Sequence, residues 1–145
     1  MTTTIRPMEE KDRDAVFEMM MQFYHSDAVW SNGSEEIFRR DIEACIGESP
    51  FIEGYILDGD GTVQGYAMLA KSYSTEFGKP CIWVEDLYIK EAFRGRKIGE
   101  VFLKYAAETY PDALFRLEVE AENERAVSLY RRCGFDVLPY MEMKR

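Results

Sequence analysis

The segment at residues 81–109 constrains the fold most, because it joins a strand to a helix through one short basic turn. Residues 81–89 form a strongly apolar run typical of a buried strand, whereas residues 97–109 carry apolar side chains at helical spacing. A helix that follows a buried strand so closely has to pack back onto the sheet. The segment therefore predicts a sheet with at least one helix on its face.

The remaining patterns extend this unit in both directions. Upstream, we expect a strand at 3–6, helices at about 11–24 and from Ser34 onward, and two strands (51–57 and 63–73) joined by the hairpin signal Asp58-Gly59-Asp60-Gly61. Downstream, we expect a strand at 114–120, a helix from 123 or 124 to a C′ residue at Gly134, and a final strand or hairpin at 135–143. An antiparallel meander followed by strand–helix–strand–helix predicts an α/β fold: a mixed, mostly antiparallel sheet of six or seven strands with helices on both faces, within one domain spanning 1–145.

Charge and composition exclude several classes of function. The formal net charge of −9 opposes binding to nucleic acid and favours cationic small molecules. No apolar run approaches the ~20 residues of a membrane span, and the first residues do not resemble a signal peptide. Three scattered cysteines and one histidine predict neither a disulfide framework nor a metal site, so we expect a cytoplasmic protein.

The basic turn itself, Arg94-Gly95-Arg96-Lys97-Ile98-Gly99, has the features of an anion site. The first turn of a helix presents unpaired backbone N–H groups and the positive end of the helix dipole. Gly95 and Gly99 allow a ligand to approach the backbone, and three cations gather here in an otherwise acidic chain. On these residues alone, the turn is either a phosphate site or a plain turn with a solvated basic face.

Two motifs together resemble the GCN5-related N-acetyltransferase (GNAT) superfamily. The basic turn matches the family's [R/Q]-x-x-G-x-[G/A] cofactor motif, except that Lys97 stands where the family has a glycine. There we expect ordinary helical dihedral angles and a side chain directed away from the ligand. The segment 123–135 is similar to the family's second signature, N-x-x-A-x-x-[L/F]-Y-x-x-x-G-F. Within the superfamily, residues 82–89 resemble the central strand of diamine (spermidine/spermine and thialysine) acetyltransferases.

The resemblance implies an enzyme that transfers an acetyl group from acetyl-CoA to a primary amine, with a polyamine-like or other cationic small molecule as the acceptor. It implies that Asn123 binds the pantetheine arm and that Tyr130 is the acid for the departing thiolate. It also implies that the backbone of Leu87, Tyr88 and Ile89 pairs with pantetheine like an added strand. The pyrophosphate is expected on the turn, at Arg94, Gly95, Arg96, Lys97, Ile98, Gly99 and Glu100. A homodimer is a further family-level expectation.

The general base is expected to be Glu85, an acidic residue on an apolar strand next to the cofactor motif. A structural carboxylate satisfied by its neighbours is the alternative. Asp86 should face the other side of the sheet, unless a bulge exchanges the two.

The acceptor pocket is expected at the end of the first helix and in the loop after it, with Tyr24, His25, Ser26 and Trp30. His25 is either a second candidate base or a rim group. Two other functions remain open from sequence: acetylation of a protein or peptide amine, and a non-catalytic module that senses acyl-CoA.

Overall fold

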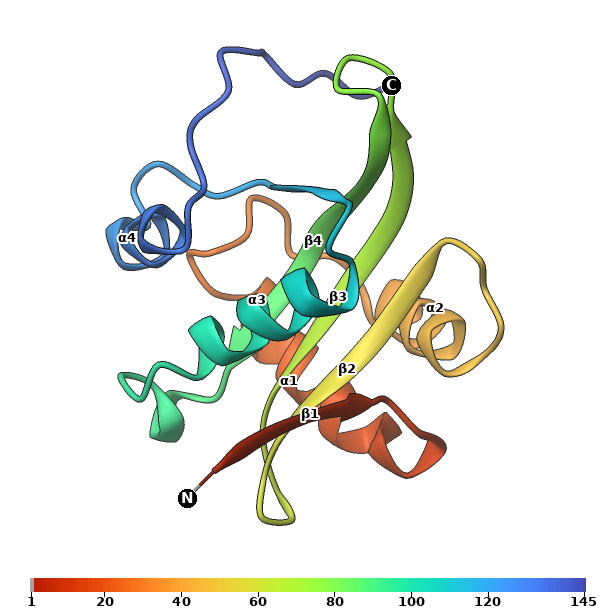
Figure 1. Ribbon diagram of the computed structural model, residues 1–145. Helices are drawn as coiled ribbons and strands as arrows, with labels where there is room; N and C mark the ends of the chain where they lie inside the picture. The colour runs from red at the N-terminus through yellow and green to blue at the C-terminus, as the bar shows by residue number, and fades with distance from the viewer. Residues whose placement is uncertain (1) are drawn as a thin grey trace.

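The computed structural model describes residues 2–145 and places a five-stranded sheet at the centre of the molecule (Figure 1). The strand order is β1-β2-β3-β4-β5; the first four strands are antiparallel neighbours and β5 is parallel to β4. The strands are β1 (Thr3–Pro7), β2 (Ile52–Gly59), β3 (Thr62–Ser74), β4 (Lys79–Ile89) and β5 (Leu114–Leu117). The helices are η1 (Glu10–Asp12), α1 (Arg13–Tyr24), α2 (Glu35–Ile46), η2 (Glu91–Phe93), α3 (Ile98–Thr109) and α4 (Glu124–Arg132). The expected mixed, mostly antiparallel sheet is confirmed.

Local signals placed several element boundaries correctly. The hairpin between β2 and β3 turns at Asp60 and Gly61, whose φ angles are 54° and 88°, as a type I′ turn requires. Ser34 caps α2, since its side chain accepts a hydrogen bond from the backbone N–H of Ile37. Gly134 follows α4 with φ of 92°.

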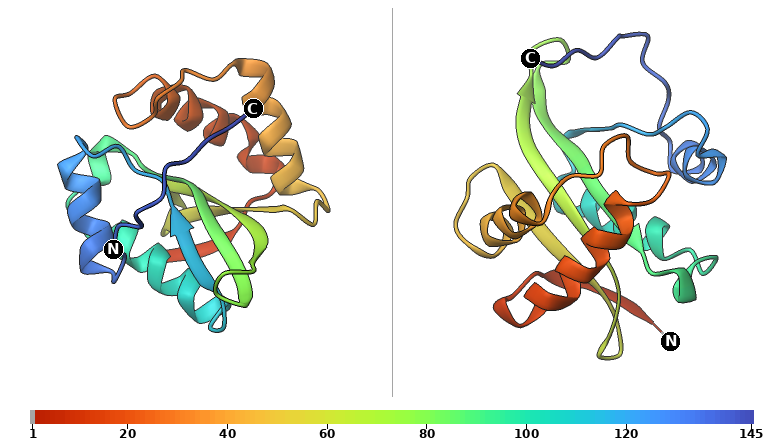
Figure 2. Two further views of the ribbon diagram at one scale, coloured as in Figure 1. Left: turned by 90° about the horizontal axis from the view of Figure 1, so that it is seen from above. Right: turned by 180° about the vertical axis from the view of Figure 1, so that it is seen from behind.

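Helices cover both faces of the sheet, which divides the core into two layers (Figures 1 and 2). The helices α1 and α2 pack on one face against Tyr66 and Met68 of β3 and Tyr88 of β4. The helix α3 packs on the other face through Phe102 and Leu103. Because β4 contributes to both layers, a side chain on this strand can reach either face.

The sheet has five strands rather than the six or seven expected, since residues 135–143 form no strand. This segment leaves α4 and crosses to the tip of the β3–β4 hairpin, where the Tyr140 hydroxyl donates a hydrogen bond to Glu76 (Figure 1). Pro139 has no N–H to give to a ladder, and β5 offers only four residues as a partner. The apolar residues from which a strand was predicted do not join the core, since several of them, including Met141 and Met143, are exposed.

In the part of the chain that the structure describes, no helix is long and apolar enough to cross a membrane.

Candidate active site

The basic turn lies between β4 and α3 with backbone angles suited to a close ligand. Gly95 has φ of 81°, in the left-handed region that favours glycine. The Arg94 Nε donates to the carbonyl of Ile89 at 2.9 Å, which ties the turn to the end of β4. The helix begins at Ile98, so the N–H groups of its first turn, including Gly99 and Glu100, are directed toward the turn. A pyrophosphate fits here through backbone donors and surrounding cations.

Lys97 departs from its predicted conformation. We expected helical dihedral angles, but Lys97 is the N-cap of α3 and has φ of 60° and ψ of 25°, which is left-handed. Its side chain makes no capping hydrogen bond. The turn has to reverse its direction at this position, and the backbone takes the glycine conformation although a side chain is present. A non-glycine residue pays for this with about 1–2 kcal/mol of strain.

Replacing Lys97 by glycine is therefore expected to stabilise the protein. The relief of strain exceeds the extra entropy of glycine in the unfolded chain, which costs about 0.5–1 kcal/mol. The net gain of roughly 0.5–1 kcal/mol should raise Tm by about 1–4 °C in thermal unfolding. Lys97→Ala is the control, because it removes the charge and keeps the strain. An equal rise of Tm in Lys97→Ala would assign the effect to charge repulsion instead.

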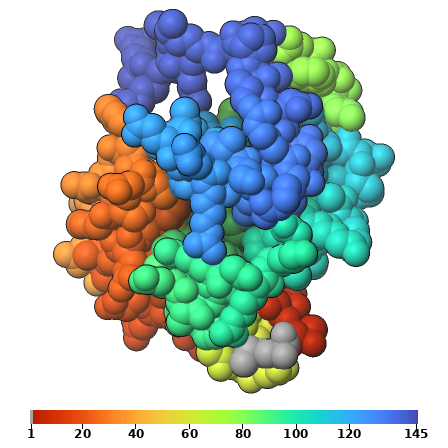
Figure 3. Space-filling view, turned by 90° about the vertical axis from the view of Figure 1, so that its left-hand side faces the viewer, coloured from red at the N-terminus to blue at the C-terminus, as the bar shows by residue number. Residues whose placement is uncertain are grey.

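The helix α4 covers the turn and adds a fourth cation to it. A Cβ built on Gly99 would lie 3.1 Å from a methyl group of Leu129, so this glycine lets α3 and α4 approach closely. A Cβ on Gly95 would lie 3.6 Å from the guanidinium of Arg125. The Glu100 carboxylate pairs with Arg132 at 3.0 Å, so its side chain is directed to α4. In the space-filling view, the turn lies directly beneath α4 (Figure 3).

A β-bulge at Glu85 changes which face the acidic residues of β4 occupy. The pairing of β4 with β3 passes from Val84↔Leu69 to Asp86↔Met68, and Glu85 is the extra residue. Val84 packs on the α3 side, yet Asp86, two residues later, lies on the α1 side. The bulge therefore shifts the alternation by one residue, so Asp86 leaves the face that a regular pleat would give it.

The two carboxylates at the bulge differ in environment. Asp86 is 3% exposed, and it accepts hydrogen bonds from the hydroxyls of Tyr24 (2.9 Å) and Tyr66 (2.6 Å). Glu85 remains accessible to solvent. Partial burial, followed by the charges of Asp86, Glu142 and Asp41, raises the pKa of Glu85. A carboxyl with a raised pKa and access to solvent has the properties of a general base.

Further carboxylates lie around Glu85. Burial and the charge of Asp86 raise the pKa of Asp41, on α2, to about 6. A hydrogen bond with Glu142 raises the pKa of Glu118 to about 7, and Glu85 contributes to the same shift. The surroundings of the bulge are thus strongly acidic, whereas the turn that begins α3 is basic.

Of the residues predicted to bind the acceptor, Tyr24 is held inside the protein, whereas His25, Ser26 and Trp30 are exposed. The Tyr24 hydroxyl is bound to Asp86, so this side chain is part of the wall. His25 and Trp30 lie exposed in the loop between α1 and α2, with Trp30 at 84%. The Ser26 hydroxyl donates to the carbonyl of Phe23 at 2.6 Å and so closes the end of α1.

Beyond the bulge, β4 has an open edge. Its pairing with β5 ends at Val84↔Leu117, so along Leu87, Tyr88 and Ile89 this edge has no strand partner among residues 2–145. β5 turns away toward α4 at this point (Figure 1). The predicted place for an added, strand-like ligand is therefore present.

Local structure fixes Tyr130 at the C-terminal end of α4. The N–H of Phe135 donates to the Tyr130 carbonyl at 3.0 Å and the N–H of Gly134 to the Arg131 carbonyl at 3.1 Å, which is a Schellman motif. The Tyr130 ring packs against Phe135 with centroids 5.8 Å apart. Burial raises the pKa of Tyr130 to about 12, so the phenol keeps its proton at neutral pH. At the other end of α4, Asn123 Oδ1 caps the helix by accepting from the N–H of Ala126 at 3.3 Å.

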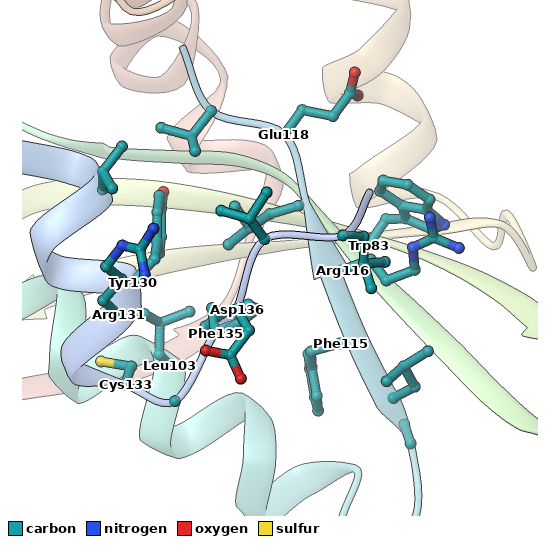
Figure 4. A pocket seen from close by; sticks show the side chains of 18 of the residues that line it. Trp83, Leu103, Phe115, Arg116, Glu118, Tyr130, Arg131, Cys133, Phe135 and Asp136 are labelled. Atoms are coloured by element: carbon teal, nitrogen blue, oxygen red, sulfur yellow. The ribbon is translucent and has the colours of Figure 1, made fainter. Parts of the chain in front are cut away.

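A hollow of about 1510 Å³ lies between β5, α3, α4 and the C-terminal segment (Figure 4). Glu100 and Tyr130 line it, together with apolar side chains such as Leu103, Phe115 and Phe135. Tyr130 and Arg131 come to it from α4, and Cys133 from the position directly after that helix (Figure 4). The hollow adjoins the free edge of β5, where a sixth strand was expected.

Sequence reasoning missed several residues that the structure brings to the cleft. Arg125 belongs to the second motif but had been given no role, although its charge beside a glycine turn was a usable signal. Tyr66 of β3 donates a hydrogen bond to Asp86, and Asp41 of α2 lies near enough to feel its charge; nothing in their local sequence indicates either interaction.

Comparisons with known proteins agree with this geometry. The model of the acetyltransferase (GNAT) family matches residues 14–135. The chain is 34% identical to thialysine N-epsilon-acetyltransferase of Sus scrofa over 143 residues, which cover 90% of this chain and 82% of that protein. It is 24% identical to spermine/spermidine N(1)-acetyltransferase of Bacillus subtilis (strain 168) over 141 residues, with coverage of 93% and 88%.

Solved structures show the same fold. A possible acetyltransferase from Clostridium difficile 630 superposes with a TM-score of 0.83 at 15% identity, covering 100% of this chain and 97% of that one. The aminoglycoside acetyltransferase AAC(6')-Iy, solved with a CoA-containing bisubstrate analogue, superposes with a TM-score of 0.80 at 15% identity, covering 100% and 98%. The chain therefore belongs to the acetyltransferase (GNAT) family, and it is an N-acetyltransferase that takes its acetyl group from acetyl-CoA.

Proposed function

We propose that the protein acetylates a primary amine of a small diamine or polyamine, with Glu85 as general base and Tyr130 as general acid. The observation that carries this proposal is the bulge at Glu85, which presents a solvent-accessible carboxylate among other acidic groups at the open edge of β4. The relatives named for thialysine and for spermine and spermidine support a diamine acceptor.

The donor end is assigned to the basic turn and α4. Arg94, Arg96, Lys97 and Arg125 supply positive charge beside the first-turn N–H groups of Ile98, Gly99 and Glu100, which would hold the pyrophosphate. The backbone of residues 87–89 would pair with the pantetheine arm, and the side-chain amide of Asn123 would donate to it. Acetyl-CoA supplies the acetyl group as a thioester, which an amine attacks directly.

Glu85 and Tyr130 then carry out the proton transfers. At neutral pH an alkylamine carries a proton, so Glu85 accepts that proton directly or through water and leaves a neutral nitrogen. Backbone N–H groups of residues 87–89 polarise the thioester carbonyl. As the C–S bond breaks, Tyr130 donates its proton to the departing sulfur and the cationic nitrogen of the adduct loses its second proton to solvent. Solvent then returns a proton to Tyr130 and removes the one held by Glu85.

The acidic surroundings select the acceptor. A diamine places one nitrogen at Glu85 and needs a counter-charge for its second ammonium group. Asp41, Glu118 and Glu142 provide negative charge around this position. His25 and Trp30 are exposed in the loop that follows Tyr24, and an aromatic face there can also contact a cation.

Thiol release from acetyl-CoA across a panel of acceptors tests the proposal. Spermidine and thialysine are expected to give kcat/KM at least about tenfold above monoamines of equal length, since a paired charge contributes about 1.5–3 kcal/mol. Peptide amines turning over as fast as the diamines would instead favour a protein acetyltransferase. No turnover with tight CoA binding would favour a sensor.

Two variants on α2 test whether Asp41 binds the second ammonium group of a diamine. Asp41→Asn should raise KM for diamines several-fold and leave monoamines unaffected. Glu43→Gln is the matched control: this carboxylate lies exposed on the same helix and pairs with Arg13 at 2.6 Å. Equal effects of both variants would contradict a specific role for Asp41.

The domain organisation, the oligomeric state and the cellular compartment are proposed as well. We propose that residues 1–145 act as one acetyltransferase domain, because the two motifs, on the turn before α3 and on α4, pack against each other beside a single sheet. The exposed Val137, Met141 and Met143 support a homodimer, which light scattering would detect. The three free cysteines support a reducing, cytoplasmic compartment.

A further inference from the structure

Asp86 is a buried carboxylate held only by neutral groups. Both of its oxygens accept hydrogen bonds from phenols, Oδ1 from Tyr24 and Oδ2 from Tyr66. Among residues 2–145 it forms no ion pair. Burial raises the pKa of Asp86, and the two tyrosine hydroxyls partly oppose that shift. Burying a carboxylate without an ion pair costs desolvation free energy, so packing alone does not explain the position of Asp86.

The elements packed around Asp86 bring no compensating charge. Tyr24 comes from α1, Tyr66 from β3, and Asp41 and Cys45 from α2. The adjoining residue on its own strand is Glu85. The charge of Asp86 raises the pKa of Asp41, of Cys45 (to about 12) and of Glu85. The negative charge of Asp86 thus acts on its neighbours from α2 and on Glu85.

The position of Asp86 connects the bulge on β4 with the C-terminal end of α1. It is the first residue after the bulge that resumes pairing with β3, opposite Met68. Its bond to Tyr24 holds the last residue of α1, from which the loop with His25 and Trp30 begins. Tyr24 in turn packs on Phe38 of α2, with ring centroids 5.1 Å apart.

We propose that Asp86 is a positioning residue for Glu85: held by Tyr24 and Tyr66, it fixes the bulge that leaves Glu85 exposed to solvent and keeps a buried negative charge beside it. This inference rests on the proposed function of Glu85 as the base. Asp86 itself contacts neither the amine nor the donor. Its charge makes the Glu85 carboxylate a stronger proton acceptor, and its hydrogen bonds keep that carboxylate in place.

The test is Asp86→Asn, which keeps the shape of the side chain and removes its charge; one acceptor oxygen becomes an NH2 donor, to which the facing tyrosine hydroxyl can turn as the acceptor. Glu85 is titrated directly by NMR of its carboxyl carbon, and the pH dependence of kcat/KM is measured in parallel. We expect the pKa of Glu85 to fall by roughly one unit, because a neighbouring like charge is removed. The acid limb of kcat/KM should move to lower pH by the same amount, and the plateau should fall roughly three- to tenfold as the base weakens.

Glu53→Gln is the matched control, since Glu53 also accepts hydrogen bonds from two tyrosines, Tyr55 and Tyr110. It also pairs with Lys71 at 3.2 Å and lies on the α3 side of the sheet. Loss of this network should lower stability and leave the titration of Glu85 unchanged. A purely structural role for Asp86 would give the same pattern in Asp86→Asn, and that result would overturn the inference.

Tyr24→Phe provides a second variant should Asp86→Asn fold poorly. Loss of one donor raises the pKa of Asp86, so less of its charge remains and the pKa of Glu85 should fall by a smaller amount. An unchanged Glu85 titration in this variant would also overturn the inference. A lowered pKa of Glu85 in Asp86→Asn with an unmoved kcat/KM profile would support the role of Asp86 and overturn the assignment of Glu85 as base.

Discussion

Glu85→Gln is expected to lower kcat at neutral pH by about 10²–10⁴-fold, the usual contribution of a general base. Glutamine keeps the size of the side chain and cannot accept the proton of an ammonium group. KM for acetyl-CoA should stay within about twofold, because the pyrophosphate is assigned to the basic turn after Ile89 and not to the bulge. Steady-state rates with varied acetyl-CoA and a fixed diamine measure both quantities.

The pH profile makes this prediction sharper. In the wild-type enzyme, activity should fall as pH drops through the raised pKa of Glu85, since the base is then protonated. Without the carboxylate, the reaction depends on amine that is already neutral in solution. That fraction rises about tenfold per pH unit up to an amine pKa near 10. The optimum of Glu85→Gln should therefore lie at higher pH.

Glu120→Gln is a suitable control, because Glu120 is an exposed carboxylate in the loop between β5 and α4. It should keep the wild-type profile and rate. A Glu85→Gln enzyme with the wild-type profile would remove Glu85 as the base and direct attention to His25, the alternative that the sequence left open.

Much of the fold could be predicted because its signals are local. The type I′ turn at Asp60-Gly61, the cap at Ser34 and the Schellman glycine at Gly134 each depend on a few neighbouring residues. The residues of the donor end were predicted in the same way, from a strand, a glycine turn and the start of a helix.

What could not be predicted depends on contacts between distant segments. A bulge changes the face of every residue after it, and whether β4 bulges at Glu85 depends on its register with β3. The burial of Asp86 follows from that register, so its bonds to Tyr24 and Tyr66 could not be seen in the sequence. The backbone conformation of Lys97 could not be predicted either, because the shape of the turn, and not the type of residue, determines its φ and ψ angles.

Tyr130→Phe is expected to lower kcat by about 10²-fold, at the lower end of the range for acid–base groups, since water can replace part of its role. Phenylalanine keeps the ring that packs against Phe135, and the Schellman hydrogen bonds use only the backbone. The fold and the affinity for acetyl-CoA should therefore be preserved. Thermal unfolding and calorimetric binding of CoA check both points.

The chemistry of the leaving group separates this role from simple packing. Since the pKa of Tyr130 is about 12, the wild-type enzyme should retain its acid throughout the neutral range and well above it. A donor with a more acidic thiol needs less help from an acid, so the defect of Tyr130→Phe should shrink with such an analogue. Leu129→Ala, on the same turn of α4, is the contrasting variant. It opens space above Gly99 and lowers stability by less than the about 2–5 kcal/mol of a fully buried leucine, because Leu129 is only partly buried, and it should be insensitive to the thiol. If Tyr130→Phe were equally insensitive, the phenol would act through position alone, and the proton for the sulfur would have to come from water at the open edge of β4.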